Sequence, residues 1–364
     1  MTEHKKLLVF HTNVAPYRVD FFNTLAERYD MFLCMDRKFV YGGLYTDIEK
    51  SYRFDYKEMI STKGMRETYK QVKQAIIAWQ PDIVMVSECG LISLAAILYR
   101  ILHHAKYRII SIIDDSFDQL TEGRQFTKRH VVAEKLMIHR FDQIINVDER
   151  VANLFQAQYG KGVSFPIIRD ESLYRGSLEK ALTTSQEYVV QYGLSGKKVL
   201  LYVGRFVKVK NIPVIIKAFQ KVCDGETRLI LVGDGEEKSN IVTMCDGDNR
   251  IILTGPLSGI ALYAWYIIAN VFVLTSYLEP FGAVTNEALM AGCKCLITKR
   301  AGSSCLIKDG VNGYCFNPLD EDEMAEKMRN LINESKPLTD MVKLRPSLMQ
   351  TTFEEEMNKV LNVL

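Results

Sequence analysis

The chain has 364 residues, of which 48% are apolar and 25% charged, and its formal net charge is +2. This length exceeds what one hydrophobic core usually serves, so we expect two domains. The small net charge, with no RNA-binding or zinc-finger signature, argues against a nucleic-acid partner.

The thiols and the N-terminal stretch indicate the compartment. The eight cysteines include no C-x-x-C pair, which favours reduced thiols in a cytosolic protein. The apolar stretch LLVF near the N-terminus is too short for the core of an export signal. We therefore expect a cytoplasmic protein.

Short apolar runs alternate with helical patterns along the first half. The expected strands are 6–11, 31–35, 82–87, 108–113 and 143–147, and the expected helices are 19–29, 68–79, 91–104 and 128–141. This alternation predicts a parallel, doubly wound α/β sheet.

A second series of the same kind follows a mixed, polar stretch. Its expected strands are 198–204, 228–233, 250–255, 271–276 and 295–298. We expect an N-terminal domain over 1–170, a connection over 171–196 and a C-terminal domain over 197–350. The helix 351–364 is expected to return to the first domain. Ligands of such sheets bind at the carboxyl ends of the strands.

The longest apolar stretch is IALYAWYIIANVFVLTSY, residues 260–277. Its length is borderline for a membrane span. Ala269 and Asn270 divide it into a helical part and a β-rich part. We expect a buried helix followed by a buried strand.

A candidate anion site lies in GRFVKVKN, where Gly204 closes a strand and a helix follows. A turn that opens a helix offers free N–H groups and the positive end of the helix dipole. Arg205 and Lys210 add two cations, which suit a diphosphate. In isolation the segment fits two solvated surface cations better.

A second constellation is LTSYLEPFGAVTNEALMAG, residues 274–292. A buried strand is followed by a Pro-x-Gly turn and a helix that begins near Ala283 and ends near Gly292. The turn can bring Glu279 back beside the helix start, and Glu287 lies about one turn into the helix. The two carboxylates can then accept hydrogen bonds from sugar hydroxyls in one cleft.

These motifs, with LILVGDGEE and DGVNGYCFNP, resemble the family 4 (group 1) retaining glycosyltransferases. The resemblance covers residues 198–332 and implies the GT-B fold, two Rossmann-like domains facing a cleft. In the first half only NVAPYRVDFFNTLA resembles polysaccharide-type members. The family's usual glycine pair is absent there, and Cys305 stands where many members carry glutamate.

The resemblance also implies residue roles. Arg205 and Lys210, beside Gly204, hold the donor pyrophosphate, Glu279 faces the transferred sugar, and Glu287 binds the nucleotide ribose. The backbone of Phe281, Gly282 and Ala283 covers the sugar-phosphate, and Gly255, Pro256 and Leu257 lie near the base.

The implied reaction is transfer of a sugar from a nucleotide-diphosphate donor to a glycan or lipid-linked acceptor, in surface polysaccharide or glycoconjugate synthesis. Configuration is retained by a front-face mechanism, in which the leaving phosphate helps to accept the proton. UDP is favoured over GDP on family grounds alone. The alternatives are a catalytically silent nucleotide-sugar-binding subunit and a nucleotide-sugar epimerase of the same fold.

Acceptor residues are expected in the first domain. Asn13, Tyr17 and Arg18 lie in the loop after the first strand, and Asp114 and Asp115 follow the strand 108–113. One of the two aspartates can orient or deprotonate the acceptor hydroxyl. A capped turn at the end of the strand explains the pair equally well.

We expect neither a metal nor a cofactor. The motif DGD at 246–248 mimics a metal-binding Asp-x-Asp, but it lies between an expected helix and strand and favours a turn. Arg205 and Lys210 can neutralise the leaving diphosphate instead.

The segment 124–140 is basic. It holds five Lys or Arg residues and one acid, Glu134; the cations are Arg124, Lys128, Arg129, Lys135 and Arg140. A solvated helix face is the first interpretation. The alternative is a surface that docks on anionic lipid at the inner face of the membrane, which would suit a lipid-linked acceptor.

Overall fold

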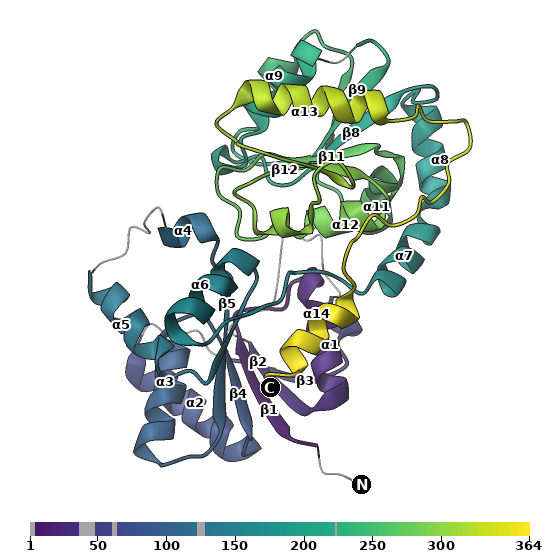
Figure 1. Cartoon of the computed structure of the whole chain (residues 1–364). Helices are drawn as coiled ribbons and strands as arrows, with labels where there is room; N and C mark the ends of the chain where they lie inside the picture. The colour runs from purple at the N-terminus through teal and green to yellow at the C-terminus, as the bar shows by residue number, and fades with distance from the viewer. Residues whose placement is uncertain (1–3, 36–47, 60–63, 122–127, 223) are drawn as a thin grey trace. The chain divides into compact units, whose positions relative to one another are not determined.

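The computed structural model describes residues 4–35, 48–59, 64–121, 128–222 and 224–364. The chain divides into two compact units (Figure 1). Unit 1 comprises Met1–Ile167 and Glu354–Leu364, and unit 2 comprises Ile168–Phe353. Each unit contains a parallel β-sheet and helices. The predicted α/β class, with two doubly wound sheets, is confirmed.

The described part of unit 1 contains a seven-stranded parallel sheet in the order β3-β2-β1-β4-β5-β6-β7. Its strands are β1 (Lys6–His11), β2 (Asp30–Met35), β3 (Asp55–Glu58), β4 (Ile83–Ser87), β5 (Arg108–Ile113), β6 (Gln143–Asn146) and β7 (Val163–Ser164). The direction of winding reverses between β1 and β4, which are hydrogen-bonded neighbours. Such a switch point is where ligands of open α/β sheets bind, at the carboxyl ends of the strands.

Helices pack on both faces of this sheet. They are α1 (Val19–Arg28), α2 (Met65–Trp79), α3 (Leu91–Leu102), α4 (Phe117–Thr121), α5 (Lys128–Ile138), α6 (Glu149–Tyr159) and α14 (Phe353–Leu361). Apolar residues of α2, α3, α5 and α6 share one core with the strands. Phe21, Phe22 and Leu25 of α1 are also fully buried.

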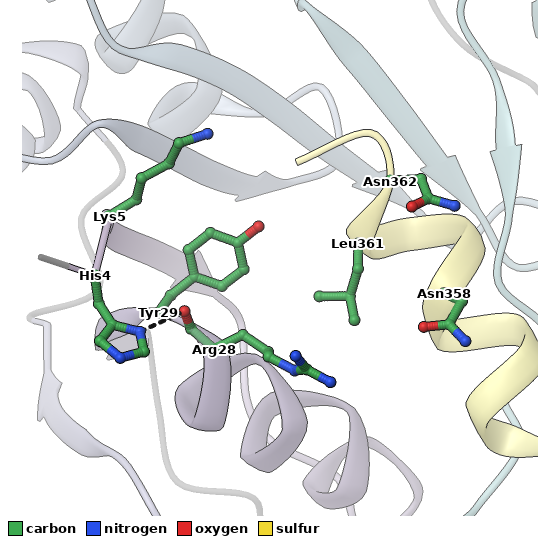
Figure 2. Close-up of a pocket in the computed structure, with 7 residues that line it drawn as sticks. All are labelled: His4, Lys5, Arg28, Tyr29, Asn358, Leu361 and Asn362. Carbon is green, nitrogen blue, oxygen red and sulfur yellow. Dashed lines mark hydrogen bonds between the residues drawn. The ribbon is translucent and has the colours of Figure 1, made fainter. Parts of the chain in front are cut away.

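Helix α14 belongs to unit 1 although it follows all of unit 2 in the chain. The Arg108 guanidinium, at the start of β5, donates to the carbonyl oxygens of Val363 at 2.8 Å and Leu364 at 2.6 Å. Between α1 and α14 lies an open pocket of about 470 Å³ (Figure 2). It is lined by His4, Lys5, Arg28, Tyr29, Asn358, Leu361 and Asn362. Because His4 and Lys5 precede β1, this pocket lies at the amino-terminal edge of the sheet, away from the switch point.

Unit 2 has a six-stranded parallel sheet in its described residues, in the order β10-β9-β8-β11-β12-β13. The strands are β8 (Lys198–Val203), β9 (Thr227–Val232), β10 (Ile251–Gly255), β11 (Val271–Leu274), β12 (Lys294–Thr298) and β13 (Gly313–Phe316). The switch point lies between β8 and β11, which pair directly. The helices are α7 (Glu171–Lys180), α8 (Leu182–Gln191), α9 (Ile212–Val222), α10 (Lys238–Cys245), α11 (Gly259–Ile268), α12 (Val284–Met290) and α13 (Glu321–Glu334).

The stretch 171–196, expected as a connection, forms α7 and α8 within unit 2. Tyr174 and Leu178 of α7 and Ser185 and Val189 of α8 are buried. The few inward-facing residues among many polar ones made the amphipathic pattern weak in the sequence.

The apolar stretch 260–277 is divided as predicted. It forms α11, which ends at Ile268, and β11, which starts at Val271. Within the described residues, no helix is both long enough and apolar enough to cross a membrane. The DGD motif lies in a turn between α10 and β10, as predicted.

Candidate active site

Two loops meet at the switch point of unit 2, one after β8 and one after β11. The first runs from Gly204 through a short 3-10 helix, Lys208–Lys210, to the start of α9. The Tyr277 N–H donates to the Val209 carbonyl at 2.9 Å. The Thr275 hydroxyl, itself buried, donates to the Lys210 carbonyl at 2.9 Å. These bonds hold the two loops together although they lie far apart in the chain.

The side chains of Lys210 and Glu279 form an ion pair across the two loops. Both are largely shielded from solvent, with 15% and 11% of the side-chain surface exposed. The Ser276 hydroxyl also donates to Glu279 Oε2 at 3.1 Å. Lys210 and Ser276 thus contact the same carboxylate oxygen of Glu279, Oε2. The structure thus brings together the residue expected at the pyrophosphate and the one expected at the sugar.

Arg205 follows Gly204 directly and is exposed. In the described part of the chain it makes no ion pair with a carboxylate. Of the two cations expected at the diphosphate, Lys210 is therefore already paired with a carboxylate, whereas Arg205 is open to an incoming anion.

The turn from Glu279 to Ala283 is tight. Gly282 has φ of +88°, and a Cβ there would lie 2.7 Å from the Leu274 side chain and 3.2 Å from Glu279 Cγ. Glycine is therefore required to place Glu279 beside the sheet edge. Helix α12 begins at Val284 and is followed by Gly292 with φ of +81°, as the sequence predicted. The backbone N–H of Ser303, after β12, donates to the Phe281 carbonyl at 2.8 Å.

Glu287 lies in the first turn of α12. Among the residues that the structure describes, Glu287 and Glu279 do not contact one another. Oε1 of Glu287 instead lies 3.7 Å from Nη1 of Arg169, and the two side chains are 15% and 16% exposed. Burial raises the pKa of the Glu287 carboxyl, whereas the Arg169 guanidinium and the Tyr266 hydroxyl act in the opposite direction.

The remaining donor candidates lie on the other side of β8. Gly255 closes β10 with φ of +79° and its carbonyl accepts a bond from the Gly233 N–H at 3.0 Å. Pro256 and Leu257 follow it and lead into α11. They stand at the same carboxyl edge of the sheet as Gly204.

The acceptor candidates of unit 1 also gather at a switch point. Arg18, which is 1% exposed, ends a short 3-10 helix, Pro16–Arg18, after β1. Its Nη2 donates to Asp114 Oδ1 at 2.5 Å. Asp114 follows β5 and keeps 39% of its side chain exposed, whereas Asp115 is 3% exposed. The accessible aspartate of the two is therefore Asp114.

Two neighbours in this cluster had not been singled out from the sequence. Glu88, after β4, accepts a bond from the Asp114 N–H at 2.9 Å. His11, the last residue of β1, contacts the Asn13 carbonyl through Nδ1 at 2.5 Å. Burial and the nearby Arg18 cation lower the pKa of His11 to about 4. His11 is thus neutral at physiological pH, with Nδ1 as the donor. Tyr17 is partly exposed on the same loop.

Comparison with known proteins identifies the unit that holds Lys210 and Glu279. Residues 185–345 match the model of the family Glycosyl transferases group 1. This stretch is a group 1 glycosyl transferase domain. The match lies wholly within unit 2.

Curated relatives match part of the chain. N-acetyl-alpha-D-glucosaminyl L-malate synthase of Bacillus anthracis is 28% identical over 151 residues, which are 40% of this chain and 39% of that protein. Lipopolysaccharide 1,2-N-acetylglucosaminetransferase of Salmonella typhimurium is 29% identical over 181 residues, 44% and 48% of the two chains. The chain thus spans less than half the length of these two relatives.

The likeness to solved structures extends over both units. A structure of Anabaena Alr3699/HepE in complex with UDP has a TM-score of 0.71 and 17% identity, and the match covers 98% of this chain and 94% of that one. Related structures of that protein contain UDP and glucose, or UDP-glucose. The group 1 domain and the similarity across both units confirm the predicted GT-B fold.

Proposed function

We propose that the protein is a retaining glycosyltransferase that transfers a sugar from a nucleotide-diphosphate donor, UDP-sugar by preference, to a glycan or lipid-linked acceptor. We assign the reaction to surface polysaccharide or glycoconjugate synthesis. The observation that carries the proposal is the Lys210–Glu279 pair at the switch point of the group 1 glycosyl transferase domain.

The pair suits such a donor for an electrostatic reason. A diphosphate that enters beside Arg205 supplies Lys210 with a second anionic partner. Glu279 can then accept hydrogen bonds from sugar hydroxyls. The structures of the Anabaena protein with UDP and with UDP-glucose support UDP as the first nucleotide to test.

On the acceptor side we propose Asp114 as the residue that orients the hydroxyl. It is more exposed than Asp115, and its bond to Arg18 fixes one carboxylate oxygen. Asn13 and Tyr17 lie on the loop that carries Arg18 and complete the acceptor candidates. No covalent nucleophile is assigned, so the chain's part is positioning and charge stabilisation.

A panel of UDP-, GDP- and ADP-sugars tests the function directly. A ligand at a hundred times its Kd stabilises a protein by about 2.7 kcal/mol, so thermal shift identifies the donor. The chosen donor is then incubated without acceptor. Slow release of nucleoside diphosphate supports the transferase, and release of free sugar with retained configuration supports the stereochemistry. Binding without turnover would indicate a silent subunit, and an epimerised donor would indicate an epimerase.

We predict that activity does not depend on a divalent metal. The Asp-x-Asp motif at 246–248 lies before β10, at the amino-terminal edge of the sheet. Both carboxylate oxygens of Asp248 are held by Arg250, at 2.8 Å and 2.7 Å. Arg205 and Lys210 neutralise the leaving diphosphate in this proposal. Activity should therefore survive EDTA, and loss in EDTA with recovery in manganese would contradict it.

We also propose that α5 docks on anionic lipid. Its residues Val132 and Leu136, one helical turn apart, are 57% and 65% exposed. Lys135, which lies between the two in sequence, and Arg140, which follows the helix, are exposed as well. Arg124 lies outside the described residues, as do the side chains of Lys128 and Arg129. An exposed apolar pair flanked by cations fits a bilayer with acidic headgroups.

The end of α5 is fixed to the rest of unit 1, which keeps this face outward. Lys161 Nζ donates to the carbonyls of His139 at 3.2 Å and Phe141 at 2.5 Å. The Arg100 guanidinium, near the end of α3, bonds the Arg140 carbonyl. Leu102, the last residue of α3, is itself 64% exposed. Helices α3 and α5 contact one another in unit 1 (Figure 1).

We predict that Val132→Ser with Leu136→Ser weakens binding to phosphatidylcholine–phosphatidylglycerol vesicles at least about tenfold, because each aliphatic side chain contributes about 1.5–3 kcal/mol on burial. Vesicle co-sedimentation measures the change. Val190→Ser is the matched control, since Val190 of α8 is 76% exposed in unit 2. Equal binding to vesicles of phosphatidylcholine alone would rule out the electrostatic part of the proposal.

A further inference from the structure

A buried cluster surrounds the Glu287 carboxylate. The side chain contacts Arg169, the second residue of unit 2, with Nη1 and Oε1 3.7 Å apart. Tyr174 of α7 and Tyr266 of α11 are fully buried and lie close enough to Glu287 to feel its charge. Two segments of unit 2, the start of α7 with Arg169 before it and helix α11, therefore converge on one carboxylate of α12.

Arg169 is itself held in place. Its guanidinium lies over the Tyr174 ring, 4.9 Å from the ring centre. Its Nη1 also lies 3.5 Å from the Tyr263 hydroxyl. A guanidinium that rests on an aromatic face keeps its planar fork oriented toward the carboxylate.

Burial raises the pKa of the titratable groups in this cluster. Burial raises the pKa of Glu287, and Arg169 is the largest influence that opposes it. Burial also raises the pKa of Tyr174 and of Tyr266 well above the usual value, and that of Cys293 to about 11. These three groups stay neutral between pH 5 and pH 8, and Arg169 stays charged.

We propose that Arg169 is a positioning residue for the donor, which keeps Glu287 ionised and oriented to accept hydrogen bonds from the ribose hydroxyls of the nucleotide. The inference rests on the proposed function, because it takes Glu287 as the ribose ligand. Arg169 itself does not touch the reacting atoms.

The proposal predicts a pH effect of known sign. An opposite charge within a few ångströms lowers a carboxyl pKa by about 1–3 units. Its removal in Arg169→Gln raises the pKa of Glu287 further, so the carboxylate becomes protonated at higher pH. The pH below which UDP affinity falls should then rise by about one pH unit. Below that pH, UDP should bind roughly tenfold more weakly to the variant than to wild type.

The experiment compares UDP with 2′,3′-dideoxy-UDP, which lacks the ribose hydroxyls, by calorimetry from pH 5 to pH 8. The variants are Arg169→Gln, Arg169→Lys and Glu287→Gln. The control is Arg175→Gln, because Arg175 of α7 binds the Met290 carbonyl at 2.7 Å and does not contact Glu287 in the described contacts. Thermal melting verifies that each variant folds, and Arg169→Lys keeps the charge where Arg169→Gln fails to fold.

Wild-type protein should prefer UDP to the dideoxy analogue, and Glu287→Gln should lose that preference at every pH. Arg169→Gln should lose it at low pH and recover it at high pH, whereas Arg169→Lys and Arg175→Gln should resemble wild type. A wild-type profile in Arg169→Gln, with the preference lost in Glu287→Gln, would overturn the role of Arg169 and leave the proposed function standing. A preference that survives in Glu287→Gln would overturn the ribose assignment as well, and absence of UDP binding in wild type would contradict UDP as the nucleotide.

Discussion

Replacing Lys210 by alanine is expected to weaken the binding of UDP about ten- to hundredfold. A hydrogen bond to a charged group contributes about 1.5–3 kcal/mol, and each 1.4 kcal/mol is a factor of ten. Lys210 is the cation that the two loops hold at the switch point of unit 2. Isothermal titration with UDP measures the change.

The same substitution has a second effect, on folding. Glu279 is 8% exposed and would keep the Ser276 hydroxyl as a partner but lose its cation. A buried carboxylate without its counter-charge destabilises the folded state, so the melting temperature should fall as well. Lys208→Ala is the matched control, because Lys208 lies on the same 3-10 helix and is exposed. Unchanged UDP affinity in a folded Lys210→Ala protein would remove Lys210 from the donor site.

Changing Glu279 to glutamine should lower kcat on the order of a hundredfold, the scale that is lost when one preorganised electrostatic contact is removed. The contact between Glu279 and the sugar strengthens as the sugar gains positive charge, so the loss falls on turnover. Glutamine keeps an oxygen for the Ser276 hydroxyl and retains the shape of the turn. Steady-state kinetics with the identified donor measures the effect.

The two glutamates can be separated by their effect on the bare nucleotide. Glu279→Gln should not weaken UDP binding, because it frees Lys210 for the phosphates and UDP lacks the transferred sugar that Glu279 is expected to contact. Glu287→Ala should mainly raise the donor KM and weaken UDP binding, since a ribose contact is the same in the ground and transition states. The opposite pattern, with UDP affinity lost in Glu279→Gln and kept in Glu287→Ala, would reverse the two roles.

The strongly apolar strands could be predicted from the sequence, whereas polar edge strands could not. The strands at 6–11 and 108–113 were predicted to the residue, because each contains a run of buried, mostly apolar residues. Strand β3, with the sequence DYKE, has no apolar pattern and pairs only with β2 in the described part of the sheet. Its formation depends on a neighbour that the local sequence does not reveal.

In the candidate site, too, the residues in motifs could be predicted from the sequence, whereas most of their contacts could not. Motifs after β8 and β11 indicated Lys210 and Glu279, since parallel strands bring their carboxyl ends to one edge. The ion pair between them depends on tertiary packing, because it joins residues far apart in the chain, and the bond from Ser276 depends on the conformation of the turn. Arg169 gave no signal, because its contact with Glu287 joins segments far apart in the chain and belongs to no motif. The place of Glu88 could have been predicted, since it follows β4 at the same edge of the sheet as Asp114.

The discontinuity of unit 1 has a consequence for synthesis on the ribosome. Helix α14 packs in unit 1 but is translated only after the whole of unit 2. Met357 and Val360 of α14 are buried, so before their arrival the matching apolar surface of unit 1 is exposed. Domains generally fold as units during synthesis. The first unit to be translated is thus the last to be completed. While the group 1 domain folds, the N-terminal part of the growing chain still lacks the helix that covers its apolar surface.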